Sequence, residues 1–179
     1  EMKGAFSSPD DVLEREIMNS LFPDTTYGCE SGGDPVNIPD LSYEEFLDFH
    51  RQYYHPSNSY IYLYGDMDME EKLRWLDEEY LCHYDKKDVN SEIHLQKPFD
   101  EVQEKTFEYS IASDESTEEN TFLSYNKVIG TTLDRELYQA FEILDYALLS
   151  APGAPLKKAL IDAGIGKDVM GSYDNGIRQ

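Results

Sequence analysis

Histidine is the residue type in this chain best suited to metal chemistry, and it occurs at His50, His55, His83 and His94. A zinc protease needs two imidazoles one helical turn apart with a glutamate between or beside them, as in HExxH or HxxEH. His50 and His55 are five positions apart, which places them about 140° from each other around a helix. We therefore expect no zinc pair on a regular helix here, and surface or core-edge roles for both side chains.

Two further segments invite a ligand interpretation and fit it poorly. Residues 66–71 are faintly similar to a calcium-binding EF-hand loop, but position six is Glu71 instead of glycine and position twelve is Asp77 instead of glutamate. Capping of the helix that follows explains these acidic residues better. The glycine pair in residues 31–35 lacks the Lys-Ser/Thr of a phosphate-binding P-loop.

Nucleophilic catalysis has no signature in this chain, because there is no Gly-x-Ser-x-Gly elbow and no Cys-His pair that suggests a nucleophile with its base. The two cysteines, Cys29 and Cys82, lie far apart and outside any CxxC spacing, so neither a zinc knuckle nor a disulfide framework is indicated. A reducing compartment is the simplest location, and we expect the protein in the cytoplasm. The residues alone thus predict no self-contained active site and no catalytic residue.

The charge balance restricts the partners. The 179 residues include 37 acidic and 15 basic side chains, for a net charge of −22. Such a surface repels nucleic acid and anionic lipid, and it suits basic partners or simply high solubility. No apolar run is long enough to span a membrane. We therefore expect neither nucleic acid nor a membrane among the partners.

Hydrophobic spacing and capping residues place the helices that must position any site. Ser8 and Pro9 begin the first helix, Ser42 and Glu45 form a capping box for the second, and Asp68 begins the third. Two more helices are predicted, a long one capped by Thr132 and a short one over residues 156–163. Alternating residues predict strands at 60–64, 107–111 and 121–129.

The order of these elements predicts an α+β fold, with helices layered on antiparallel sheets. Residues 84–104 are charged and polar with Pro98, which is typical of a linker. We place a domain boundary near residue 100, dividing the chain into residues 1–100 and 101–179. The chain starts within an apparent helix and stops within an apparent strand, so we expect it to be part of a larger protein.

Several strings together resemble the pitrilysin/insulinase family of metallopeptidases, in its presequence-protease and falcilysin branch. The strings, in the family's order, are residues 1–9 (EMKGAFSSP), 31–35 (SGGDP), 38–41 (IPDL), 49–58 (FHRQYYHPSN), 150–156 (SAPGAPL) and 158–166 (KALIDAGIG). The resemblance covers essentially the whole chain. It implies related α+β domains arranged in two halves that close on a peptide. In those terms residues 1–100 form the second half of the first, catalytic domain, and residues 101–179 begin the next.

The resemblance also implies zinc and a role for one residue. In this family two histidines of an inverted HxxEH helix and a distant glutamate hold the metal, and the glutamate within HxxEH activates the attacking water. The distant glutamate begins the Glu-Met-Lys-Gly string, which here makes Glu1 a metal ligand. The HxxEH helix would precede Glu1, so this chain alone is not expected to hold zinc or to cleave peptides.

Two functions fit these features. The first is a fragment of a zinc endopeptidase that degrades unfolded peptides, basic ones among them, together with the remaining part of the same polypeptide. The alternative is a non-catalytic acidic binding or scaffold module, or a degenerate family member that retains the fold without the metal. An HxxEH motif upstream of Glu1 would favour the peptidase.

Overall fold

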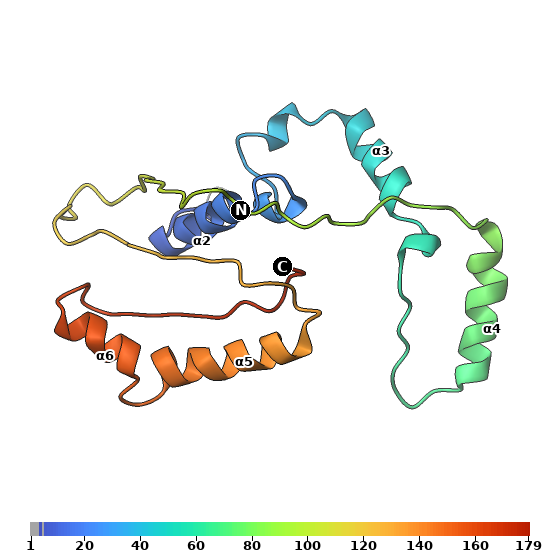
Figure 1. The fold of residues 1–179 in the computed structure, drawn as a ribbon. Helices are drawn as coiled ribbons and strands as arrows, with labels where there is room; N and C mark the ends of the chain where they lie inside the picture. The colour runs from blue at the N-terminus through green and yellow to red at the C-terminus, as the bar shows by residue number, and fades with distance from the viewer. Residues whose placement is uncertain (1–3, 5) are drawn as a thin grey trace. The chain divides into compact units, whose positions relative to one another are not determined.

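The computed structural model describes residue 4 and residues 6–179, so Glu1 lies outside the described residues. Helices and the loops between them make up the described chain (Figure 1). The α-helices are α2 (Pro9–Leu21), α3 (Tyr43–Tyr53), α4 (Met69–Glu79), α5 (Arg135–Asp145) and α6 (Pro155–Asp162). Short helical turns lie at Thr26–Gly28, Ile38–Asp40, Pro56–Asn58, Leu81–His83 and Tyr146–Ser150.

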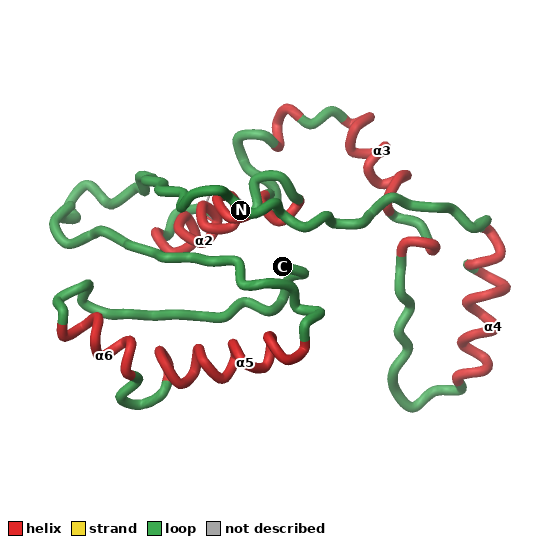
Figure 2. The backbone as a smooth tube through the Cα atoms, in the orientation of Figure 1, coloured by secondary structure: helices red, strands yellow, loops and turns green. Residues whose placement is uncertain are grey.

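The predicted layered α+β fold is wrong for the described residues, which contain no β-strand (Figure 2). Residues 60–64, 107–111 and 121–129 are loops instead. A strand exists only when its backbone hydrogen bonds are paired with those of a neighbouring strand. In residues 60–64 the side chains of Tyr60, Tyr62 and Tyr64 are almost fully exposed. Alternation in the sequence was present there, but no strand lies beside it.

The predicted starts of the first two helices are confirmed. The Ser8 side chain accepts a hydrogen bond from the Asp11 N–H and caps α2. At α3, Ser42 Oγ accepts from the Glu45 N–H while the Glu45 carboxylate accepts from Ser42, which completes the capping box. The Glu45 carboxylate accepts from both the Ser42 hydroxyl and the Ser42 N–H, and these two hydrogen bonds hold the pKa of Glu45 below its usual value. A capping box satisfies two backbone donors that the helix itself cannot pair.

The other helices are also confirmed, with one correction at a terminus. Asp68 accepts from the Glu71 N–H and begins α4 as predicted. The cap of α5 is Asp134, whose carboxylate accepts from the Leu137 N–H at 3.0 Å, and not Thr132. The Thr132 hydroxyl donates instead to the Arg178 carbonyl at 3.4 Å, and the Thr132 N–H donates to the same carbonyl at 3.1 Å. The carboxylate of Asp134 therefore becomes the cap.

The chain divides into two units. The described residues of unit 1 are 4, 6 and 30–94, with α3 and α4. Unit 2 contains residues 7–29 and 95–179, with α2, α5 and α6. The chain thus leaves unit 2 after Cys29 and returns to it at Leu95.

Little of the described chain is buried. Phe22 (2% exposed), Ala154 (4%) and Gln96 (5%) are its only buried residues. All three buried residues belong to unit 2. Capping and side-chain hydrogen bonds consequently carry more of the local order than a hydrophobic core does.

No helix in the described part of the chain is both long enough and apolar enough to cross a membrane.

Thr25 provides a first test of this local order. Its Oγ1 is buried, and among the described residues it is the one buried side-chain N or O atom without a hydrogen-bond partner. Removing an unsatisfied buried hydroxyl is favourable by about 1 kcal/mol. We expect Thr25→Val to slow hydrogen exchange of the Gly28 N–H, which donates to the Thr25 carbonyl at 3.1 Å. Thr26→Val is the control, since Thr26 is exposed; equal slowing in both variants would contradict this explanation.

Candidate functional site

The predicted metal ligand, Glu1, lies outside the described residues. Among residues 4 and 6–179, no group of three or more His, Cys, Asp or Glu side chains could hold a metal ion. A catalytic zinc needs three protein ligands and an open fourth position. The described residues contain no set of three ligands of this kind.

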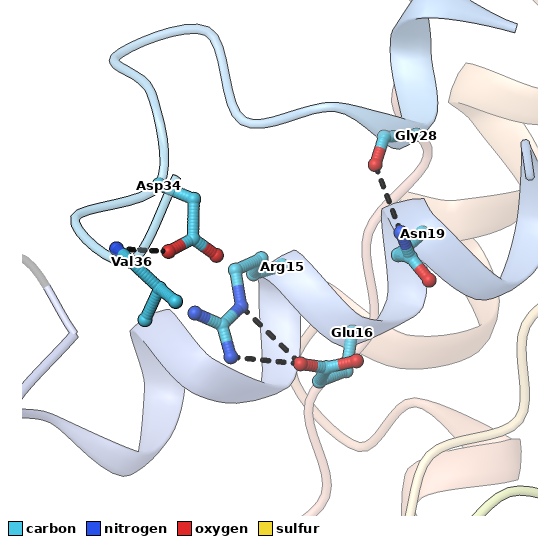
Figure 3. A network of polar contacts seen from close by, with 6 residues as sticks. All are labelled: Arg15, Glu16, Asn19, Gly28, Asp34 and Val36. Carbon is cyan, nitrogen blue, oxygen red and sulfur yellow. Dashed lines mark hydrogen bonds and ion pairs between the residues drawn. The ribbon is translucent and has the colours of Figure 1, made fainter. Parts of the chain in front are cut away.

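In the SGGDP loop, Asp34 forms hydrogen bonds with the backbone of the residues that follow it. Asp34 Oδ1 accepts from the Val36 N–H at 2.7 Å (Figure 3), and the Asp34 carbonyl accepts from the N–H groups of Asn37 and Ile38. Gly33 has a φ of +86°, and a Cβ there would lie 3.1 Å from the Ile38 side chain. Because Asp34 occupies the nearby amides, the loop is a closed turn and not a phosphate cradle.

Helix α2 is tied to the turn that follows it. The Asn19 side-chain amide donates to the Gly28 carbonyl at 3.1 Å (Figure 3). On the same helix, Arg15 Nη2 contacts Glu16 Oε1 at 2.8 Å, and both side chains are less than a third exposed. The end of α2 is therefore held against residues 26–28 by a side chain and not only by chain connectivity.

The FHRQYYHPSN string forms the C-terminal end of α3 and the turn after it. His50 stacks on Tyr54 with ring centroids 4.6 Å apart. His55 Nδ1 accepts from the Ser57 N–H at 3.1 Å, and its ring meets Tyr84 edge-on at 5.4 Å. The two histidines thus have different partners, and each organises its own aromatic and turn contacts.

Residues far along the chain complete this end of α3. Lys87 Nζ donates to the Arg51 carbonyl at 3.2 Å, which satisfies a carbonyl at the negative end of the helix. Ser91 Oγ donates to Asn58 Oδ1 at 2.5 Å, and the Asn58 amide donates to the Tyr53 carbonyl at 3.0 Å. Sequence reasoning missed Lys87 and Ser91, because both lie in a charged, polar segment that resembles a linker.

The SAPGAPL and KALIDAGIG strings line a hollow of about 640 Å³ in unit 2. Lys157 Nζ lies 2.9 Å from Asp168 Oδ1 at this hollow. The hydrogen bond from Lys157 lowers the pKa of Asp168, and a hydrogen bond from the Val169 N–H adds to the effect. The other lining residues include Leu149, Ala154, Ile161 and Met170. Its charged side chains already form ion pairs, so the geometry gives no chemistry of its own.

Comparison with known proteins identifies relatives over the whole chain. The family model described as the Peptidase M16 inactive domain matches residues 40–178. Protein HypA of Clostridium perfringens (strain 13 / Type A) is 52% identical over 179 residues, which are 100% of this chain and 18% of that protein. Presequence protease 1, chloroplastic/mitochondrial, of Arabidopsis thaliana is 40% identical over 96% of this chain and 16% of its own length. The mitochondrial presequence protease of Xenopus laevis is 34% identical over 99% of this chain and 17% of its own length.

The chain thus spans less than a fifth of the length of these relatives.

Proposed function

This chain belongs to the M16 peptidase family, and on that premise we propose that it is part of a zinc-dependent endopeptidase that degrades unfolded peptides. The observation that carries the proposal is the match to proteins named presequence protease over at least 96% of this chain. Such a protein would use these residues together with the remaining part of the same polypeptide.

Within that protein, this chain would supply structure and one metal ligand. The matched family model is described as an inactive domain, and the described residues contain no metal-binding cluster. We propose Glu1 as the third zinc ligand, with two histidines and the catalytic glutamate coming from an HxxEH helix that precedes it. A single carboxylate binds zinc weakly, so Glu1 would act only in the company of those ligands.

The division into residues 1–100 and 101–179 stays a proposal. The family model runs from residue 40 to residue 178 and so extends on both sides of the proposed boundary. We propose that the first part completes the catalytic domain and that the second part begins the next domain.

The net charge of −22 supports basic, extended peptides as substrates, because an acidic wall attracts cationic chains.

We propose the cytoplasm as the compartment. The relative at 52% identity is bacterial, whereas the names of the plant and frog relatives place those proteins in chloroplasts or mitochondria.

The isolated chain is expected to be inactive. The purified 179-residue polypeptide, supplied with zinc, should leave a fluorogenic basic peptide uncut, because on this proposal two ligands and the general base would lie outside these residues. The full-length protein assayed in parallel is the positive control. Zinc-dependent cleavage by these residues alone would show that the chain carries a complete site and would contradict the proposal that two ligands and the general base lie outside it.

The alternative function is a non-catalytic acidic binding or scaffold module, which the description of the matched model as an inactive domain favours. The coding sequence upstream of Glu1 separates the two. An HxxEH motif there supports the peptidase, and a reading frame without it supports the binding module or a degenerate family member.

A further inference from the structure

We infer that Gln96 is a latch that joins three segments of unit 2: residues 22–29, residues 95–97 and residues 176–179. These segments are far apart in the sequence, and Gln96 bonds to the other two at the same time. The latch closes unit 2, and its role does not depend on the proposed peptidase activity.

The side chain of Gln96 forms the first half of the latch. It is 5% exposed, and it is the one buried polar side chain among the described residues. Its Oε1 accepts from the Asp24 N–H at 2.9 Å, and its Nε2 donates to Asp24 Oδ2 at 2.7 Å. An amide has both a donor and an acceptor, so this one side chain satisfies two groups of Asp24. A buried amide that lost these partners would bear the full cost of its desolvation.

The main chain of Gln96 forms the second half. Its N–H donates to Gln179 Oε1 at 2.6 Å, and its carbonyl accepts from Gln179 Nε2 at 3.2 Å. The residue next to Gln179 is fixed as well, because the Arg178 N–H donates to Tyr27 Oη at 3.0 Å and the Arg178 carbonyl accepts from the Thr132 N–H at 3.1 Å. The C-terminal segment is thereby tied both to the 22–29 segment and to the residues preceding α5.

Two aromatic residues pack together within the 22–29 segment of the latch. Phe22, which is 2% exposed, meets the Tyr27 ring edge-on at 5.7 Å. The hydrogen bonds of Gln96 to Asp24 and Gln179 are part-buried, and groups that are removed from water in this way are more costly to leave unpaired than those on the surface. Phe22 and Gln96 are two of the three buried residues of the described chain, so burial in unit 2 is concentrated here.

The latch lies near the two points at which the chain leaves unit 2 and returns to it. The chain leaves unit 2 after Cys29 and returns at Leu95, and Asp24 and Gln96 lie close to these two points in the sequence. Their hydrogen bonds hold the outgoing and returning segments side by side, whatever residues 30–94 do. Gln96 is thus a positioning residue that joins two parts of unit 2 that residues 30–94 separate in the sequence.

A donor–acceptor exchange tests the latch in the 179-residue chain. Gln96→Glu keeps the shape but places two carboxylates against each other, since the side chain at position 96 no longer donates to Asp24. Hydrogen exchange of the Arg178 and Thr132 N–H groups is expected to accelerate at least about tenfold. Adding Asp24→Asn restores a donor, because the new amide at position 24 faces the new carboxylate at position 96. The double variant is expected to return both rates to within about threefold of the original chain.

Gln103→Glu is the matched control, because Gln103 is exposed and contacts only the nearby Glu101 carbonyl. If Gln96→Glu does not fold, hydrogen exchange is measured in Gln179→Ala instead. This variant should accelerate exchange of the Gln96 N–H without adding a charge. Equal effects of Gln96→Glu and Gln103→Glu, failure of the double variant to restore protection, or unprotected Arg178 and Thr132 in the original chain would each overturn the latch.

Discussion

Replacing Glu1 with glutamine in the full-length protein is expected to lower kcat/KM for a peptide substrate by about a thousandfold, or about 4 kcal/mol. Glutamine has nearly the size of glutamate but no negative charge, and a neutral amide is a much poorer zinc ligand than a carboxylate. The same variant is expected to contain less zinc per mole than the original protein. Peptide cleavage and zinc content measured on one preparation check both parts.

The control for this experiment is Glu14→Gln, because Glu14 is an exposed residue of α2. It removes the same charge from the surface and is expected to change kcat/KM by less than about twofold. Full zinc content and full activity in Glu1→Gln would remove Glu1 from the metal site. Equal losses in both variants would instead indicate that the overall charge, and not ligation, governs activity.

The helices could be predicted from the sequence because their signals are local. Ser42 and Glu45 stand three positions apart, and the capping box that they predict is present. Ser8 before Pro9 likewise marks the start of α2. The one misplaced cap, Thr132 in place of Asp134, failed for a non-local reason: Thr132 is bonded to Arg178.

The strands could not be predicted in the same way. Tyr60 to Tyr64 alternate as a strand does, but alternation describes one chain and pairing requires a second. Nothing in residues 60–64 specifies a partner, and the structure gives them none. The same reasoning explains why a layered α+β fold, built on those segments, was the wrong prediction for the described residues.

The candidate site was predicted only through the family strings, and Glu1 stays a prediction because it lies outside the described residues. Those strings identified the family correctly, and the match to residues 40–178 confirms it. They could not indicate that Lys87 supports the end of α3 or that Gln96 bonds to Asp24 and Gln179, since these pairs lie 36, 72 and 83 positions apart. Contacts at such separations arise from the fold and have no signature in spacing.

Gly28→Ala is expected to destabilise the start of unit 2 by about 1–3 kcal/mol, as overpacking does elsewhere. A Cβ at position 28 would lie 2.4 Å from the carbonyl oxygen of Phe22, which is closer than any real contact of this kind. The backbone must therefore move, which stretches the bond from Asn19 Nδ2 to the Gly28 carbonyl and the bond from the Gly28 N–H to Thr25. Exchange of the residue-28 N–H should accelerate about 5- to 150-fold, the equivalent of that free energy.

Gly171→Ala is the comparison for Gly28→Ala, because the added Cβ would clash with a side chain instead of the backbone. A Cβ there would come within 2.2 Å of Leu149 Cδ1, which is a closer approach than at Gly28 but to the end of a side chain that can rotate away. We expect it to accelerate exchange in its own surroundings less than Gly28→Ala does. A larger effect at Gly171 would mean that the turn after α2 yields more easily than the packing of Leu149. The close contact between residues 22 and 28 would then not be what requires glycine at position 28.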